Sequence, residues 1–148
     1  MKKALSLFLV LLLAFSSVSI SAFAEDCVIY LENGYYVVRT VEEIPSVHAS
    51  SASDVRVKEG VATETYYDAS DELVAIVTVY GTFEYDGSRA EAVEASYEYE
   101  EYNGWSFQRG IAYCSGASAI ASVTFENPPT LEFRAVARLT CSPTGSLS

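Results

Sequence analysis

The segment LVAIVTVYGTFEY, from Leu73 to Tyr85, decides the fold of this chain. Every odd-numbered position in it is apolar or glycine, and a period of two is typical of a β-strand with one buried face. Residues 93–100, 117–125 and 131–141 alternate in the same way. Because no convincing helical pattern follows the N-terminal leader, the sequence predicts an all-β protein.

Turn residues separate these alternating runs. Asn33-Gly34, Asp86-Gly87 and Asn103-Gly104 are hairpin signals, and Asn127-Pro128-Pro129 cannot continue a central strand. Short strands with a turn about every ten residues favour an antiparallel β-sandwich, with an immunoglobulin-like arrangement as one form of it. We expect an N-terminal β-hairpin at residues 25–44, a polar linker or loop at 45–54, and the sandwich domain at 55–148.

The N-terminus carries the pattern of a secretory signal peptide. Lys2 and Lys3 precede an apolar run, and small residues then lead to an Ala-Phe-Ala ending at Ala24. A transmembrane anchor would need about 20 apolar residues, and this run is shorter. We therefore expect residues 1–24 to be removed by cleavage between Ala24 and Glu25. The protein should be secreted and extracellular, with no stable membrane anchor.

The charge of the chain limits its partners. The formal net charge is −11, and the leader would remove two lysines and no acid, so the exported protein is more acidic still. Nucleic acids bind to clusters of Lys and Arg, and anionic lipids also attract basic surfaces. The composition argues against both classes of partner.

Three cysteines, Cys27, Cys114 and Cys141, all follow the leader. An oxidising location favours one disulfide and one remaining thiol, and three pairings are open. We prefer Cys114–Cys141, because both residues lie near strand ends in the same half of the chain. Cys27 would then be free or would pair between molecules. With a single histidine, His48, and no C-x-x-C motif, a zinc site is not expected.

The stretch ASYEYEEYNGWSF, from Ala95 to Phe107, crowds aromatic rings beside carboxylates. A hairpin with the three-residue loop Tyr102-Asn103-Gly104 separates apolar from polar residues best. Its apolar face would carry the pairs Tyr99–Phe107, Ala95–Ile111 and Val93–Tyr113. In this register most of the aromatic residues are core, and acids such as Glu98 and Glu100 form the solvated back of the hairpin.

Three residues of this hairpin are candidates for ligand contact. Arg109 falls on the apolar face opposite Tyr97, where it would either stack on that ring or grip a ligand carboxylate. Tyr102 and Trp105 flank the turn, and two exposed rings side by side can stack on sugars. The alternative for Trp105 is a place at the end of the core.

The sequence contains no convincing set of catalytic residues. His48 lies in the polar linker, so a Ser-His-Asp arrangement is not expected. Asp68 to Glu72 lacks the ligand spacing of an EF-hand and is predicted to be a turn. We expect no cofactor and a non-catalytic extracellular binding module, with a glycan or a protein as partner. The alternatives are a small glycan-active hydrolase using acids near Trp105, and a structural or matrix protein assembling through its edge strands.

The segments ENGYYV, TYYDASDELVAIVTVYGTFEYDGSRA, YNGWSF and LTCSPTGSLS occur in this order. The chain thereby resembles a family of small secreted proteins of Gram-positive anaerobes (Firmicutes) that ends in LTCS-x-x-G and has no established activity. The resemblance implies secretion and an all-β fold. Many members carry a cysteine shortly after the YDG turn, where this chain has residues 90–93, so Cys114 would have to replace that partner.

Overall fold

The computed structural model describes residues 27–45, 55–129 and 131–148. The expected leader with its cleavage site at Ala24 and Glu25, and the expected linker apart from Pro45, lie outside the described residues. His48 lies outside them too. Among the residues described there is no helix of the length and hydropathy that crossing a bilayer requires.

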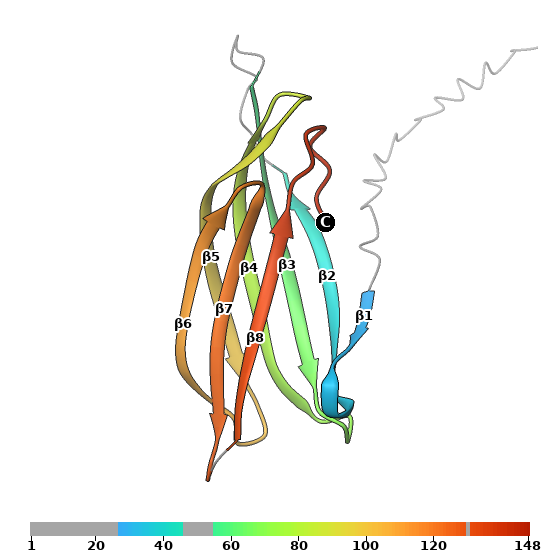
Figure 1. Ribbon diagram of the computed structural model, residues 1–148, viewed down its shortest axis with the longest axis vertical. Coiled ribbons are helices and arrows are strands. Elements are labelled where there is room, and N and C mark those ends of the chain that lie inside the picture. Colours follow the sequence, from blue (N-terminus) through green and yellow to red (C-terminus); the bar gives the residue numbers. More distant parts are fainter. Residues whose placement is uncertain (1–26, 46–54, 130) are drawn as a thin grey trace, which may run out of the picture.

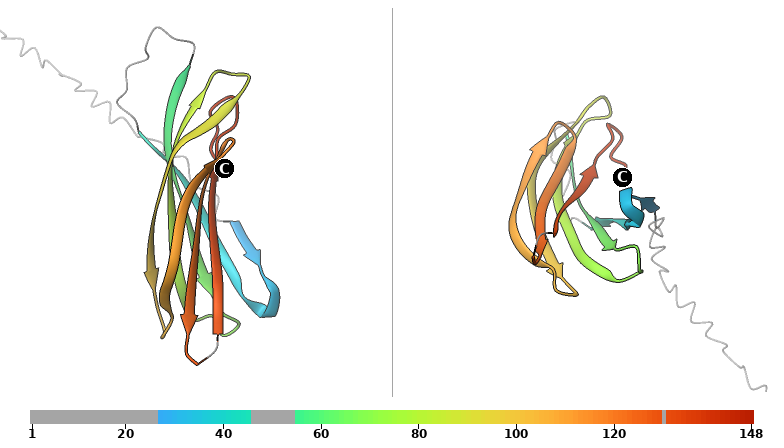
Figure 2. Two further views of the ribbon diagram at one scale, coloured as in Figure 1. Left: turned by 60° about the vertical axis from the view of Figure 1, so that its left-hand side comes forward. Right: turned by 60° about the horizontal axis from the view of Figure 1, so that its bottom comes forward.

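Two antiparallel sheets pack face to face and confirm the predicted all-β sandwich (Figures 1 and 2). The larger sheet contains β1 (Cys27–Tyr30), β2 (Tyr36–Ile44), β3 (Arg56–Tyr67), β4 (Leu73–Tyr85) and β5 (Ala90–Glu101). The smaller sheet contains β6 (Ser106–Ser115), β7 (Ser118–Asn127) and β8 (Leu131–Thr140). A 3-10 turn, η1 (Glu32–Gly34), joins β1 to β2.

The strands follow one another in chain order within each sheet, β1-β2-β3-β4-β5 and β6-β7-β8. An immunoglobulin fold instead builds each sheet from strands of both halves of the chain. The connectivity is therefore that of two meanders and not of an immunoglobulin domain. The N-terminal hairpin is continuous with the larger sheet, because β2 pairs with β3 from Tyr36 opposite Tyr67 to Ile44 opposite Glu59.

The core lies between the sheets, where the alternating residues meet. Fully buried side chains come from both layers: Val77, Val79 and Phe83 from β4, Val123 and Phe125 from β7, and Leu139 from β8. Burying one such side chain stabilises the fold by roughly 1.5–3 kcal/mol. Gly81 lies among them, and a Cβ on it would be 2.8 Å from both the Ala119 Cβ and the Phe83 ring.

The expected β5–β6 hairpin ladder is wrong. β5 pairs with β4 and β6 pairs with β7, so the chain passes from one sheet to the other between Glu101 and Ser106. The strands still touch through side chains: the Tyr99 and Phe107 rings stack with centroids 4.4 Å apart. The Tyr97 ring covers Gly110, where a Cβ would lie 2.5 Å from the Tyr97 hydroxyl. Ring packing takes the place of backbone pairing at this corner.

A β-bulge in β6 changes which residues face the core. The register shifts between Phe107, which pairs with Phe125, and Arg109, which pairs with Thr124, so Gln108 is an extra residue. One extra residue moves all later side chains to the opposite face. The expected core residues Ile111 and Tyr113 are therefore 59% and 43% exposed.

The expected Cys114–Cys141 disulfide is not present in the structure. All three cysteines are free thiols, with Cys27 and Cys114 exposed and Cys141 buried. Cys114 is on β6, whereas Cys141 directly follows β8 and donates its backbone N–H to Ala117. β7 lies between the two strands, which puts them about 10 Å apart, and a disulfide needs Cα atoms within about 7 Å.

Candidate functional site

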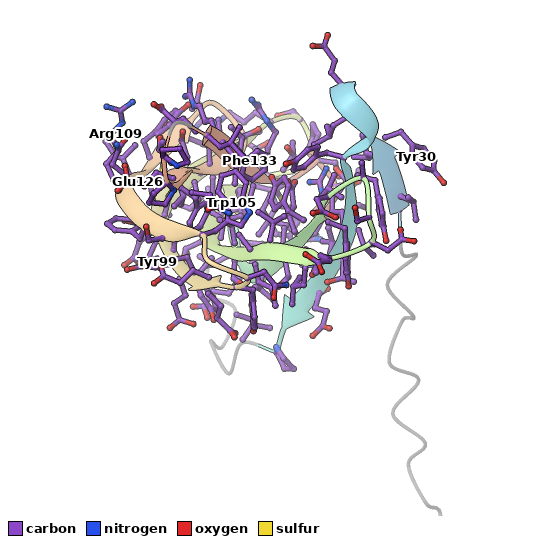
Figure 3. All side chains as sticks on the ribbon, turned by 90° about the horizontal axis from the view of Figure 1, so that it is seen from below. Tyr30, Tyr99, Trp105, Arg109, Glu126 and Phe133 are labelled. Atoms are coloured by element: carbon purple, nitrogen blue, oxygen red, sulfur yellow. The ribbon has the colours of Figure 1, made fainter. Side chains whose placement is uncertain are left out.

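Trp105 is a core residue. It is 8% exposed, and its ring meets Phe133 edge to face with centroids 6.0 Å apart. Figure 3 shows both rings in the interior of the sandwich. The positive φ angles of Asn103 and Gly104 turn the chain back, and the Trp105 N–H bonds to the Tyr102 carbonyl at 3.0 Å. A buried indole offers no ring face to a ligand.

Tyr102 is half-buried and points toward an acid. Its hydroxyl donates to Glu100 at 2.5 Å, and that hydrogen bond raises the pKa of Tyr102. Glu98 accepts from the Tyr80 hydroxyl at 3.0 Å in the same way. Glu98 and Glu100 line a half-open depression on β4 and β5 together with Tyr97 and Tyr99, of which Tyr99 is 39% exposed. The two carboxylates lie two residues apart on one face of β5, and each accepts from a tyrosine hydroxyl, so they do not face one another across a cleft.

Arg109 is exposed on the outer face of the smaller sheet and does not stack on Tyr97. Its Nη2 atom lies 3.5 Å from Glu132 Oε1, and both side chains are largely exposed, at 73% and 59%. Surface ion pairs of this kind contribute about 0–1 kcal/mol. The three predicted ligand-contact residues are therefore not brought together, and only Arg109 has a freely accessible side chain.

Arg109 belongs to a larger surface that we call the arginine face. The register of β6, β7 and β8 places on it the exposed side chains of Arg109, Ile111, Tyr113, Arg134, Val136 and Arg138. Ser122 and Thr124 of β7 form its floor, and the Arg134 Nε donates to the Ser122 hydroxyl at 2.9 Å. The face thus combines exposed apolar side chains with three guanidinium groups in an otherwise acidic chain. The exposed Glu126 and Glu132 lie at the end of the same surface where β7 meets β8, and Glu132 pairs with Arg109, so the positive charge gathers at Arg134 and Arg138.

The opposite side of the molecule has the opposite charge. The outward residues of β4 and β5 include the exposed Glu84, Glu91, Glu94, Glu98 and Glu100, which we call the acidic face. Glu84 and Glu91 are directly paired across the two strands, and like charges in that position are destabilising. Neither strand supplies a lysine or arginine.

A buried polar network closes the free edge of β8, and sequence reasoning missed it. The Tyr66 hydroxyl donates to Glu64 at 2.5 Å and accepts the Val136 N–H at 3.0 Å. The Arg138 N–H bonds to the Glu64 carboxylate, and the Arg39 guanidinium donates to the Arg138 carbonyl. The C-terminal Ser148 pairs with Thr140 through two backbone hydrogen bonds. Such coverage protects an edge from pairing with other strands.

Burial dominates the electrostatics of this network. It raises the pKa of Glu64, although Tyr66, the Arg39 guanidinium 3.9 Å away and the Arg138 backbone all act to lower it. Burial beside Glu64 also raises the pKa of Tyr66. The sequence could have indicated the network only through Arg39, Glu64 and Tyr66, which are polar residues at inward positions of β2 and β3. Their partners on β8 are backbone groups, which carry no signal in the sequence.

A different edge, that of β1, is open. Its four residues are all exposed, with Val28 at 47%, Ile29 at 40% and Tyr30 at 81%. The Tyr30, Tyr36 and Tyr67 rings form a row across β1, β2 and β3, with centroids 6.1 and 4.9 Å apart. Tyr30 ends this row away from the body of the sandwich (Figure 3).

In the described part of the chain, no three His, Cys, Asp or Glu side chains gather closely enough to hold a metal ion. Comparison of the chain with protein-family models, with curated proteins and with solved structures gives no significant match. The arginine face is the surface that combines accessible charge with accessible apolar area, and it is our candidate functional site.

Proposed function

We propose that this protein is a secreted, non-catalytic extracellular interaction module that binds through the arginine face. One observation carries the proposal: Ile111, Tyr113 and Val136 are exposed together among three arginines. Interfaces are enriched in tyrosine and arginine, and apolar side chains surrounded by charged ones match their anatomy. A protein surface suits this face better than a glycan, because its centre is aliphatic and guanidinium-rich.

The glycan-active hydrolase has little support, since Trp105 is buried and Glu98 and Glu100 lie side by side on one face of β5 rather than across a cleft. Glycoside hydrolysis needs two carboxyl groups held across a substrate. A hydrolytic turnover that disappears on changing one Asp or Glu would overturn our proposal.

The binding test is co-sedimentation of residues 25–148, at about 1 µM, with bacterial cell walls that retain their surface proteins. Insoluble polysaccharides serve as the comparison, and a protein-binding face should not retain them. The proposal expects any partner found to be lost in Arg134→Glu/Arg138→Glu, with the fold retained by circular dichroism. Arg56→Glu/Arg89→Glu is the matched control, because it makes the same change in charge away from the face. Binding that persists in the first variant would contradict a role for the arginine face.

A second candidate, a matrix protein that assembles through edge strands, is favoured by the open β1 edge. Exposed apolar edge strands are templates for pairing with another chain, and an inward or edge lysine blocks such pairing. Assembly lost in Val28→Lys would support this candidate. A Cys27→Ser protein that forms the same assemblies would remove the thiol from it.

A further inference from the structure

The acidic face and the arginine face lie on opposite sides of one sandwich. The first is the outer surface of β4 and β5 in the larger sheet, and the second is the outer surface of the smaller sheet. Figure 2 shows the two sheets packed against each other, so that the two outer surfaces point in opposite directions. A single molecule therefore cannot bring its own two faces together.

We propose that the partner of the arginine face is a second copy of this chain, which docks by its acidic face. This inference rests on the proposed function and names its partner. The argument is charge complementarity: Arg134 and Arg138 meet a surface whose carboxylates repel one another. Complementary charges fix the register of an interface and exclude wrong partners.

The centres of the two faces also match. The arginine face offers Ile111, Tyr113 and Val136. The acidic face offers the half-buried Ile76 and Tyr80 beside the depression that Glu98 and Glu100 line. Apolar contacts surrounded by charge pairs are the usual arrangement of a protein interface.

The geometry determines the kind of assembly. Contact between two different faces is heterologous, and when the faces are on opposite sides of the molecule the chain of contacts does not close. Copies should therefore add one after another into an open stack. A face of three ten-residue strands measures about 33 by 14 Å, which is small for a stable interface, so association should be weak.

The test is sedimentation velocity of residues 25–148 between about 1 and 500 µM at roughly 0.15 M salt, where the Debye length of about 8 Å screens the repulsion of the net charge. The wild-type sedimentation coefficient should rise with concentration without levelling off at a dimer. Arg134→Glu/Arg138→Glu and Glu94→Lys/Glu98→Lys should each remain monomeric. An equimolar mixture of the two variants should associate again, because each retains the native face that the other lacks.

Glu32→Lys/Glu72→Lys is the control for the acidic-face variant, since it makes the same charge change outside both faces and should associate as the wild type does. If either reversal variant is unfolded, Arg134→Gln/Arg138→Gln or Glu94→Gln/Glu98→Gln takes its place, with weakened association expected.

Three outcomes would overturn the inference. These are a wild type that is monomeric at 500 µM, association unchanged in both face variants, and a mixture that stays monomeric. Association lost only in Val28→Lys would assign it to β1. In each of these cases the proposed function is judged separately. It would still hold if Arg134→Glu/Arg138→Glu loses co-sedimentation with a partner that the wild type binds.

Discussion

The Tyr66 hydroxyl, which lies 2.5 Å from Glu64, is also 3.0 Å from the Val136 backbone nitrogen of the other sheet. One hydroxyl group thus connects a buried carboxylate in β3 to the free edge of β8. Tyr66→Phe leaves both partners buried without this bond, and an unsatisfied buried polar group costs about 1–3 kcal/mol. We expect the free energy of unfolding to fall by that amount in urea denaturation. Tyr113→Phe, at an exposed position, should change it by less than about 0.5 kcal/mol.

Glu64 should make stability depend on pH. Its folded pKa is raised by burial, so between the unfolded value near 4.5 and the higher folded value the native state binds more protons than the unfolded state. Stability contributed by neutral Glu64 is therefore present below pH 4.5 and is lost as pH rises through the folded pKa.

Glu64→Gln removes this titration. The unfolding free energy of the wild type minus that of Glu64→Gln should fall as pH rises from about 4 to 8. Equilibrium unfolding at a series of pH values measures this difference. A difference that stays flat, or that rises with pH, would show that the folded pKa of Glu64 is not raised.

The thiols should react at two rates. Cys27 and Cys114 are exposed and should be alkylated within the same fast phase, whereas Cys141 is buried and its pKa is raised by that burial. Thiolate is the reactive form, so Cys141 should react only slowly or on unfolding. Mass spectrometry after timed alkylation identifies each site. Rapid labelling of Cys141, or a bridged Cys114–Cys141 peptide, would contradict the described packing.

Gly81 has no room for a side chain. An added Cβ would meet Ala119 and Phe83, both fully buried, so Gly81→Ala should lower the free energy of unfolding by about 1–3 kcal/mol. Gly110→Ala should cost less, because the group in its way is the hydroxyl end of the half-buried Tyr97 ring, which can rotate outward. Thermal unfolding of the two variants tests the order, and a lower Tm for Gly110→Ala would reverse it.

The alternating pattern was sufficient to predict β4, β5, β7 and β8 and their arrangement as a sandwich, but β3 was not singled out as a strand. Leu73–Tyr85 is a strand throughout, and its odd positions from Ala75 to Phe83 are buried as expected. A period of two reports which residues share a face while the strand stays regular. It does not report which strands are hydrogen-bonded, and for this reason β5 and β6 were wrongly paired.

The candidate site was predicted only at Arg109, and for a different reason. The predicted register placed Arg109 on an apolar face, where a charged side chain does not fit. The bulge at Gln108 removes this inconsistency by turning Arg109, Ile111 and Tyr113 outward together. The arginines of β8 join them through a pairing with β7 that local spacing cannot reveal. The same holds for Glu64 and Tyr66, whose partners come from residues about 70 positions away along the chain.

Gln108 has a consequence for how this surface can change during evolution. Deleting its codon would place Arg109 directly after Phe107 and make the ladder regular, while Arg109 stays opposite Thr124 and Ile111 opposite Ser122. Ile111 and Tyr113 would therefore still face outward without the bulge. The pairing of β6 with β7, and not the number of residues that precede it in the strand, determines which side chains this surface presents.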